Sequence, residues 1–448
     1  MNVYRLGTAS RVASTMAATS AFSSHDLTPT IGRFLDRHLL LPLLDFLSSR
    51  ELAPKDDLEK AKLTVLFKTN MLDLAVDIYK GLNSTSDVPA SIATRREEVL
   101  SNMKALQAEV EPILAVVGDP GRVEELKHNR CFTQAYLGQQ LNITPAQIEV
   151  LLKWAKFLFE CGNYEQAANL LGSYRLLTSD SDKAFSALWG KLAGEILNRA
   201  WDAALEDLNA LRDAIDARTS TPPAMVLQQR CWLMHWALFL LGNHTNGRAV
   251  VADLFLQEKW LQALQTNAPH LLRYLAVAVV TNPRRRDKMR DLVRVIGIER
   301  ANYSDPITSF LEDLHTRANF EDAQERLKAC AQVLDRDFFL CNSEVLFLKA
   351  ARLSIFESYC RIHERINLAM LAQKLGMEQI AAEKWIVKMV SDAQLNAKID
   401  SQSGHVILGV QPPDVYQQVI EKTKGLSFRS YVLAQNIEKR SSAAVTAE

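Results

Sequence analysis

The chain is poor in the two residues that most often turn or break a polypeptide. Its 448 residues include only 17 glycines and 14 prolines. Because many short strands need many turns, this scarcity favours long helices. Hydrophobic residues make up 48% and charged residues 23%, a composition that excludes wholesale disorder. We therefore predict a mostly α-helical globular protein.

An excess of one charge sign is also missing, since 52 lysines and arginines balance 52 aspartates and glutamates. A protein that binds nucleic acid mainly through phosphates normally carries a basic excess. We therefore expect protein partners and leave direct nucleic-acid contact open. The strongest basic run, Arg284, Arg285 and Arg286, is a candidate contact for RNA or for an acidic neighbour. A solvated loop is the alternative interpretation and the more common one.

Long apolar runs and paired cysteines are absent as well. No stretch reaches the roughly 18 apolar residues that span a bilayer, and the nearest, 232–241, is interpreted as a buried helix. The six cysteines show neither a C-x-x-C pair nor the spacing of a zinc site or a disulfide framework. Reduced core cysteines are typical of an intracellular protein. We expect a cytoplasmic protein, with the nucleus as a second location.

Residues 1–25 contain no acidic residue and many serines, threonines and alanines. Mitochondrial transit peptides have this composition, but they are also rich in arginine. Only Arg5 and Arg11 occur here. We therefore favour a disordered extension over a mitochondrial targeting segment.

Motifs that carry chemistry are missing throughout. The sequence has no phosphate-binding loop, no dinucleotide fingerprint, no nucleophile elbow and no zinc-protease helix. The nine histidines are scattered without the spacing of metal ligands. We predict no catalytic residue, no metal site and no cofactor, and therefore a protein that is not an enzyme.

What the sequence does contain is the helical period. One apolar stripe begins near the N-terminus and is interrupted by Pro42. The stripe consists of Ile31, Phe34, Leu35, His38 and Leu39. Since no second ligand accompanies His38, we interpret it as a hydrogen-bonded core histidine.

A four-residue pattern of aromatic, acidic, any residue and alanine recurs along the chain. It begins at Tyr164, Trp201 and Phe320, with a weaker copy at Leu72. The large residue can open a helix, the acid suits the positive helix N-terminus, and the alanine lets a neighbouring helix approach. Ahead of Tyr164 a short turn at 161–163 joins two amphipathic segments, which predicts an antiparallel hairpin. These features predict a tetratricopeptide-like solenoid of irregular period, against chance recurrence.

The last hundred residues change character. Two short helical patterns are followed by a strand-like segment at 395–400, a turn at 401–404 and a second strand-like segment at 405–409. This order predicts a winged helix over residues 366–409. Trp385 and Met389 share the apolar face of its second helix, and we expect them to pack the module.

A winged helix often binds DNA through that second helix. Here the helix is net acidic, because Glu378, Glu383 and Asp392 outnumber Lys384 and Lys388. Base and phosphate contacts require the opposite balance. A winged-helix DNA-binding regulator is therefore the least favoured function.

The strand-like segment that contains Val406, Ile407 and Leu408 is expected at the edge of a small sheet. Unpaired backbone groups at an edge can pair with another chain, which makes these residues a candidate docking edge. They could equally cover the helices of the module itself. A final helix carries Val419, Leu426 and Leu433 at seven-residue spacing.

A helical array that leads into a winged helix resembles the PCI proteins, which build the proteasome lid, the signalosome and eukaryotic translation initiation factor 3. Individual segments are most similar to the e-subunit family of that factor. They are residues 26–39, 159–164, 188–193, 305–308, 382–387, 416–424, 426–430 and 436–439. Residues 1–25 precede the usual start of that family, and 116–146 match it less well.

The resemblance implies a domain order and a set of partners. The helical-repeat region would cover 26–227, followed by a PCI domain at 228–409 with a helical part at 228–365 and the winged helix at 366–409. The sequence pattern itself predicts the C-terminal helix, placed at 410–440, and a disordered tail at 441–448. The partners would be other subunits of the factor, the small ribosomal subunit and other initiation factors, in support of messenger RNA recruitment. A PCI subunit of the proteasome lid or signalosome is the alternative.

Overall fold

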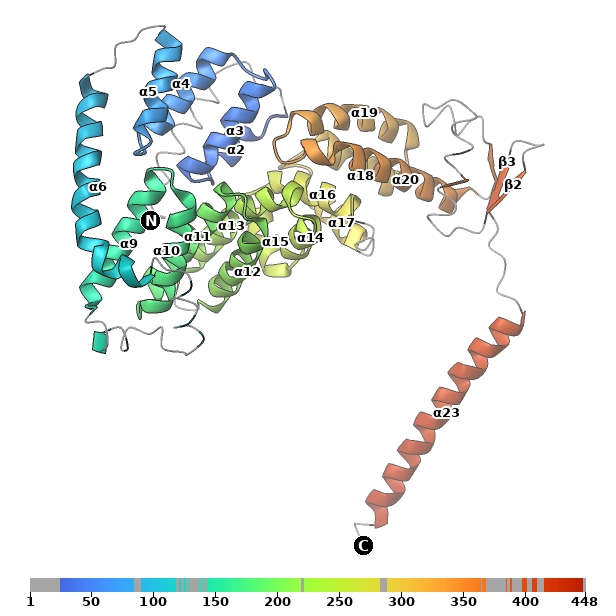
Figure 1. The fold of residues 1–448 in the computed structure, drawn as a ribbon. Coiled ribbons are helices and arrows are strands. Elements are labelled where there is room, and N and C mark those ends of the chain that lie inside the picture. Colours follow the sequence, from blue (N-terminus) through green and yellow to red (C-terminus); the bar gives the residue numbers. More distant parts are fainter. Residues whose placement is uncertain are drawn as a thin grey trace. The chain divides into compact units, whose positions relative to one another are not determined.

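The structure is a computed structural model, and it describes residues 25–83, 90–117, 143–218, 221–282, 288–363, 365–367, 397–400, 405–408 and 415–445 with a few isolated positions between them (Figure 1). The chain divides into two compact units. The first comprises Met1–Ala351 and the second Arg352–Glu448. Each unit is described by itself below.

The first unit is a succession of helices, as the low content of glycine and proline predicts. Its α-helices are α2 (Thr28–Ile31), α3 (Arg37–Ser49), α4 (Lys55–Leu66), α5 (Leu72–Asn83), α6 (Ala90–Val117), α9 (Pro145–Glu160), α10 (Tyr164–Leu177), α11 (Ser181–Leu197), α12 (Trp201–Ala217), α13 (Pro223–Asn243), α14 (Gly247–Phe255), α15 (Glu258–Asn267), α16 (Leu272–Val280), α17 (Met289–Glu299), α18 (Pro306–His315), α19 (Phe320–Arg336) and the first part of α20 (Glu344–Ile362). Two short 3-10 helices, Pro269–Leu271 and Cys341–Ser343, precede α16 and α20.

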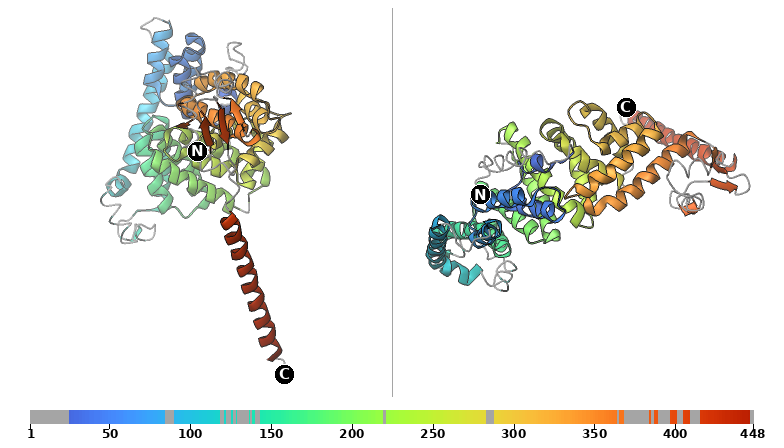
Figure 2. Two further views of the ribbon diagram at one scale, coloured as in Figure 1. Left: turned by 90° about the vertical axis from the view of Figure 1, so that its right-hand side faces the viewer. Right: turned by 90° about the horizontal axis from the view of Figure 1, so that it is seen from above.

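Consecutive helices pack against one another along much of this unit. Each of α9, α10, α11 and α12 contacts the next helix in sequence, and α18 packs on α19 in the same way. Figures 1 and 2 show these helices side by side, as in a stack of helical hairpins. The predicted mostly α-helical solenoid is confirmed.

The turns between hairpin helices share one backbone conformation, a residue with positive φ. Gly162, Arg199 and Ala318 have φ values of 90°, 60° and 51°, in the left-handed region. Such a residue ends a helix because it reverses the chain while leaving the last carbonyls free to accept hydrogen bonds. The N–H of Asn163, next to Gly162, accordingly donates to the carbonyl of Leu158 at 2.9 Å. Two residues after each left-handed position the next helix begins.

Those next helices begin at the residues that the repeated pattern identifies. Tyr164, Trp201, Phe320 and Leu72 are the first residues of α10, α12, α19 and α5. The pattern's alanine is 0% exposed in all four copies, at Ala75, Ala167, Ala204 and Ala323. The three aromatic residues themselves are only half-buried. The alanine, rather than the aromatic residue, therefore marks the tightest helix contact.

Two helices at the centre of the first unit are buried on every side and are mostly apolar. Every residue from Cys231 to Leu241 in α13 is buried, and so is every residue from Leu272 to Val279 in α16. A helix without a polar face must be enclosed by other elements. The prediction of a buried helix at 232–241 is confirmed.

The N-terminal segment packs onto this centre. Phe34 lies between α2 and α3 and stacks on the ring of His235 in α13, with ring centroids 4.1 Å apart. Trp236 donates its indole N–H to the carbonyl of Phe34 at 3.2 Å. His235 is fully buried and donates from Nδ1 to the carbonyl of Cys231 at 2.6 Å. Burial lowers the pKa of His235 to about 4, so the ring against Phe34 is uncharged at neutral pH.

The predicted stripe at 31–39 is interrupted earlier than expected and continues beyond Pro42. The chain leaves α2 after Ile31 and starts α3 at Arg37, where Asp36 accepts a hydrogen bond from the backbone N–H of His38. Pro42 lies inside α3, which runs on to Ser49. Leucines buried on both sides of Pro42 hold the helix in place, which offsets the missing hydrogen bond.

The second unit contains the end of α20, three strands and a long helix. The strands are β1 (Arg365–Asn367), β2 (Ala397–Asp400) and β3 (His405–Leu408), and the helix is α23 (Val415–Val445). The predicted antiparallel hairpin of the wing is confirmed, because β2 pairs with β3. The predicted helix runs unbroken through Gly425 and ends five residues later than the expected boundary at 440. Residues 441–445 were expected in a disordered tail, but they contain no helix breaker and continue the helix.

Candidate functional site

The described residues provide surfaces and buried polar clusters. Among them no group of three or more His, Cys, Asp or Glu side chains is placed to hold a metal ion. Within the same part of the chain, no helix combines the length and the apolar character needed to cross a membrane. The candidate site is therefore sought among the surfaces of the sheet and of α23.

The three strands form a small antiparallel sheet with the order β1-β3-β2. On one side of β3, Ile366 lies opposite Val406, and on the other side Ile399 lies opposite Val406 as well. The strand of Val406, Ile407 and Leu408 is therefore the central strand, and the prediction that it forms the free edge is wrong. Its backbone groups are used on both sides, and the Val406 side chain is 0% exposed.

The free edges belong to β1 and β2. Each of these strands pairs with β3 along one side and has no other strand partner among the described residues. Sequence reasoning missed β1 because its three residues, although they alternate polar and apolar side chains, are too few for the alternation to indicate a strand. Unpaired N–H and C=O groups at an edge are the usual template for a strand from another chain.

Two groups of predicted site residues fall outside the part of the chain that the structure describes. Trp385 and Met389 lie outside the described residues, and so do Arg284, Arg285 and Arg286. Lys384, Val387 and Lys388 are helical and exposed, in agreement with a helix in this part of the wing module.

Helix α23 exposes apolar side chains along its length. Its 31 residues correspond to about 46 Å at the usual rise per residue. Large hydrophobic side chains are between 40% and 76% exposed at Tyr416, Val419, Ile420, Leu426, Phe428, Tyr431, Val432, Leu433 and Ile437. The predicted positions Val419, Leu426 and Leu433 belong to this set and share one face.

The apolar residues of α23 are not confined to that face. Phe428 follows Leu426 by two residues and therefore points about 200° away around the helix. A helix with apolar residues on opposite sides is usually enclosed by other helices. Helix α23 thus offers apolar contacts on more than one side, between charged and polar residues.

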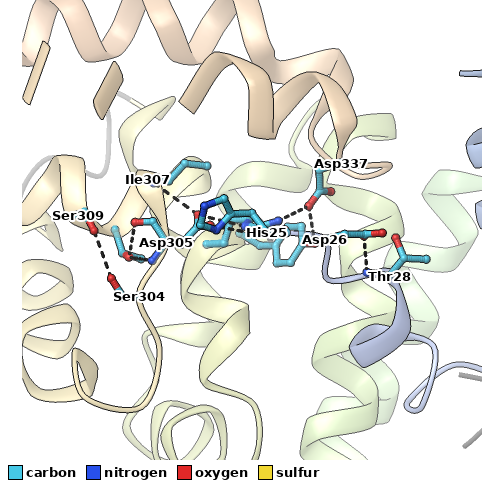
Figure 3. Close-up of polar contacts among 11 residues, drawn as sticks. His25, Asp26, Thr28, Ser304, Asp305, Ile307, Ser309 and Asp337 are labelled. Carbon is cyan, nitrogen blue, oxygen red and sulfur yellow. Dashed lines mark hydrogen bonds and ion pairs between the residues drawn. The ribbon is translucent and has the colours of Figure 1, made fainter. Parts of the chain in front are cut away.

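A buried ionic cluster connects His25, which precedes α2, to α16, α18 and α19 (Figure 3). Arg273 donates to both carboxylate oxygens of Asp305, at 2.7 and 3.1 Å, and to Asp337 at 3.1 Å. Its Nη2, which also donates to Asp305, donates to the carbonyl of His25 at 2.7 Å. Tyr274 donates its hydroxyl to Asp337 at 2.7 Å.

This cluster is structural in character, since each of its charges has a partner. Burial raises the pKa of Asp337, although Arg273 and Tyr274 act in the opposite direction. Asp305 also caps α18 by accepting from the N–H of Ile307 at 3.4 Å. The sequence signal for this cap is the Asp-Pro-x-Thr order at 305–308, which resembles a capping box. Nothing in the sequence indicates that Arg273 is its partner.

His38 shows the same structural role, as predicted. The residue is fully buried, and its Nδ1 lies 3.1 Å from the hydroxyl of Tyr164. Its Nε2 lies 3.5 Å from a carboxylate oxygen of Glu160. Burial acts to raise the pKa of Glu160, but the hydrogen bond to His38 and the charge of Arg37 together outweigh it and lower that pKa.

Comparison with known proteins identifies three family models that match parts of this chain. Residues 26–158 match the family model of the eIF3 subunit 6 N-terminal domain, and residues 327–409 match the PCI domain. Residues 415–434 match the C-terminal region of the E subunit of eukaryotic translation initiation factor 3. The PCI match begins within α19, ninety-nine residues after the boundary at 228 that the resemblance implied.

Relatives from plants and insects cover almost the whole chain. The Arabidopsis thaliana protein is 43% identical over 434 residues, which are 94% of this chain and 98% of the relative. The Bombyx mori protein is 42% identical over 94% of this chain and 96% of its own length. The Drosophila melanogaster protein is 44% identical, with the same two coverages. Each of the three is named as the E subunit of eukaryotic translation initiation factor 3 in its organism. The chain belongs to the E-subunit family of eukaryotic translation initiation factor 3.

Proposed function

We propose that this protein is a scaffold that holds other subunits of initiation factor 3 together and supports binding of the small ribosomal subunit, of other initiation factors and of messenger RNA in the cytoplasm. Members of the family are PCI subunits of the factor and not enzymes. The observation that carries the scaffold role is α23, on which every side chain whose burial is described is exposed. Exposed apolar side chains gathered on one element mark a site of contact with partner chains.

The partners of α23 are helices of other subunits of the same factor. Val419, Leu426 and Leu433 form a seam of the kind that inserts into a facing helix. Lys422 and Arg429 lie beside the seam at the same seven-residue spacing, so a partner helix with acidic residues along that side fits best. The free edges of β1 and β2 offer a second contact, by strand addition.

The seam can be tested by replacing Leu426 and Leu433 with aspartate. Because the two leucines are about 60% exposed in the free chain, the substitutions should leave its folding intact. They should remove co-purification with the other subunits, since a charge in a helix seam costs several kcal/mol when buried. Affinity purification with quantitative mass spectrometry measures the loss. Ser427→Asp/Ala434→Asp, at exposed positions about 100° around the helix from the two leucines and away from Lys422 and Arg429, is the matched control and should retain the complex.

Ribosome binding is tested in the same cell extracts. The wild-type chain should sediment with small ribosomal subunits, and the Leu426→Asp/Leu433→Asp chain should move to the light fractions. A double variant that still enters the complete factor would refute α23 as the docking helix. A wild-type chain that never sediments with small ribosomal subunits would refute the ribosomal part of the proposal.

A further inference from the structure

We propose that helix α17 forms an RNA-binding face that contacts phosphates through Arg290 and Arg294. The inference rests on the proposed function, since initiation brings the chain next to RNA. The two residues are four positions apart and therefore share one side of the helix. Both are exposed, and neither forms an ion pair with any described residue.

Most other charged side chains at this helix form contacts within the protein. Lys288 reaches Asp253 at 3.4 Å, and Arg300 pairs with Glu312 at 2.9 Å. Glu299 is buried and accepts a hydrogen bond from Asn302 at 2.8 Å. Asp291 is exposed and lies three positions before Arg294, so it lowers the positive charge beside that arginine, but no ion pair joins the two among the described residues. The two arginines thus remain available to an outside anion.

The shape of the face suits close approach. Gly297 follows Arg294 by three residues and lies on the same side. The position that a Cβ atom would occupy on Gly297 has no neighbouring heavy atom within 4 Å. A ligand can therefore reach the helix backbone between the arginines and the C-terminal end of the helix.

Arginine binds both carboxylate and phosphate oxygens in a bidentate manner, so the guanidinium group alone does not choose between the two. The concentration of cations at and just before this helix favours a polyanion such as RNA. In the sequence three further arginines, at 284–286, lie just before this helix, separated from it by Asp287 and Lys288, in a chain whose net charge is zero. A local basic region in a neutral protein binds by counterion release, which requires no sequence specificity. Ile298, at 60% exposure, is the feature that a protein partner would use instead.

The test is the salt dependence of binding to a short fluorescent single-stranded RNA, measured by anisotropy on the full chain. Arg290→Gln/Arg294→Gln should reduce the slope of log K against log salt by about 1.4, since each phosphate contact on a single strand contributes about 0.7. The affinity at about 0.1 M salt should fall roughly tenfold. Lys328→Gln/Arg336→Gln, two exposed cations on α19, is the control and should change neither quantity.

Two further experiments distinguish RNA binding by α17 from the scaffold role of α23. Arg290→Gln/Arg294→Gln should still enter the complete factor, and Leu426→Asp/Leu433→Asp should still bind RNA as a free chain. An RNA duplex in place of the single strand then shows whether structured or single-stranded RNA is preferred. The proposal is overturned if the wild-type chain binds no RNA or if the arginine variant keeps its slope. It is equally overturned if Ile298→Asp and the arginine variant lose other subunits rather than RNA.

Discussion

At the scale of single residues, burial between helices changes the ionisation of Glu195. It is buried in α11, where one carboxylate oxygen lies 2.8 Å from the ammonium of Lys191. Lys191 also reaches Asp207 of α12 at 2.8 Å. Burial raises the pKa of Glu195 to about 7, and the neighbouring Asp207 acts in the same direction. The folded protein therefore prefers this carboxyl group protonated.

A pH dependence of stability follows. Because the folded pKa exceeds the unfolded value, the stabilisation by Glu195 is complete below about pH 4.5 and is lost as the pH rises through about 7. Glu195→Gln imitates the protonated form. It should raise the free energy of unfolding at pH 8 by roughly 1–3 kcal/mol and change it much less at pH 5. Thermal unfolding at both pH values measures this, and an equal difference at pH 5 and pH 8 would contradict the assignment.

At the scale of elements, the turns between helices decide where each hairpin ends. The left-handed position is occupied by glycine at Gly162 but by side-chain-bearing residues at Arg199 and Ala318. A left-handed conformation costs an L-residue roughly 1–2 kcal/mol. The two turns without glycine therefore keep their shape because the packed helices on either side impose it.

Opposite substitutions at two of these turns should have opposite effects. Gly162→Ala should lower the free energy of unfolding by about 1 kcal/mol, since its φ of 90° is strained for alanine. Ala318→Gly should raise it by about 0.5 kcal/mol, because the relief of strain exceeds the added chain entropy. Chemical denaturation of the two variants beside the wild type gives both values. If both changed stability in the same direction, the turns would not be governed by backbone strain.

At the scale of the whole first unit, the start of the chain packs against helices that are distant in sequence. Arg273 binds the carbonyl of His25, 248 residues away, and neutralises Asp305 and Asp337. Both carboxylates are almost fully buried. The cluster therefore ties the N-terminal segment, α16, α18 and α19 into one cooperative body (Figure 3).

Replacing Arg273 should lower the stability of the first unit. Arg273→Met keeps the length of the side chain but leaves two buried carboxylates unpaired, which costs roughly 3–5 kcal/mol. We expect a lower midpoint of thermal unfolding and faster tryptic cleavage after Arg33. Arg300→Met removes a surface partner of Glu312 and should cost less than about 1 kcal/mol. Equal destabilisation by the two substitutions would show that the cluster does not hold the N-terminal segment.

Much of the helical architecture could be predicted from the sequence, because it depends on local interactions. The starts of α5, α10, α12 and α19, the buried alanines and the β2–β3 hairpin all follow from spacing within a few residues. The family could also be recognised from short segments, and the comparisons confirm it. The candidate site was predicted less well, since the supposed edge strand of Val406 is central.

The sequence by itself determined where α5, α10, α12 and α19 start, that their alanines are buried, and which family the chain belongs to. Only the tertiary structure decided which strand lies at the centre of the sheet, where α3 begins, and that Arg273 is the partner of His25, Asp305 and Asp337. The physical reason is the distance along the sequence over which each interaction acts. Helix periodicity and turn conformations arise from neighbours in sequence, whereas strand order and the pairing of buried charges depend on segments that meet only after folding.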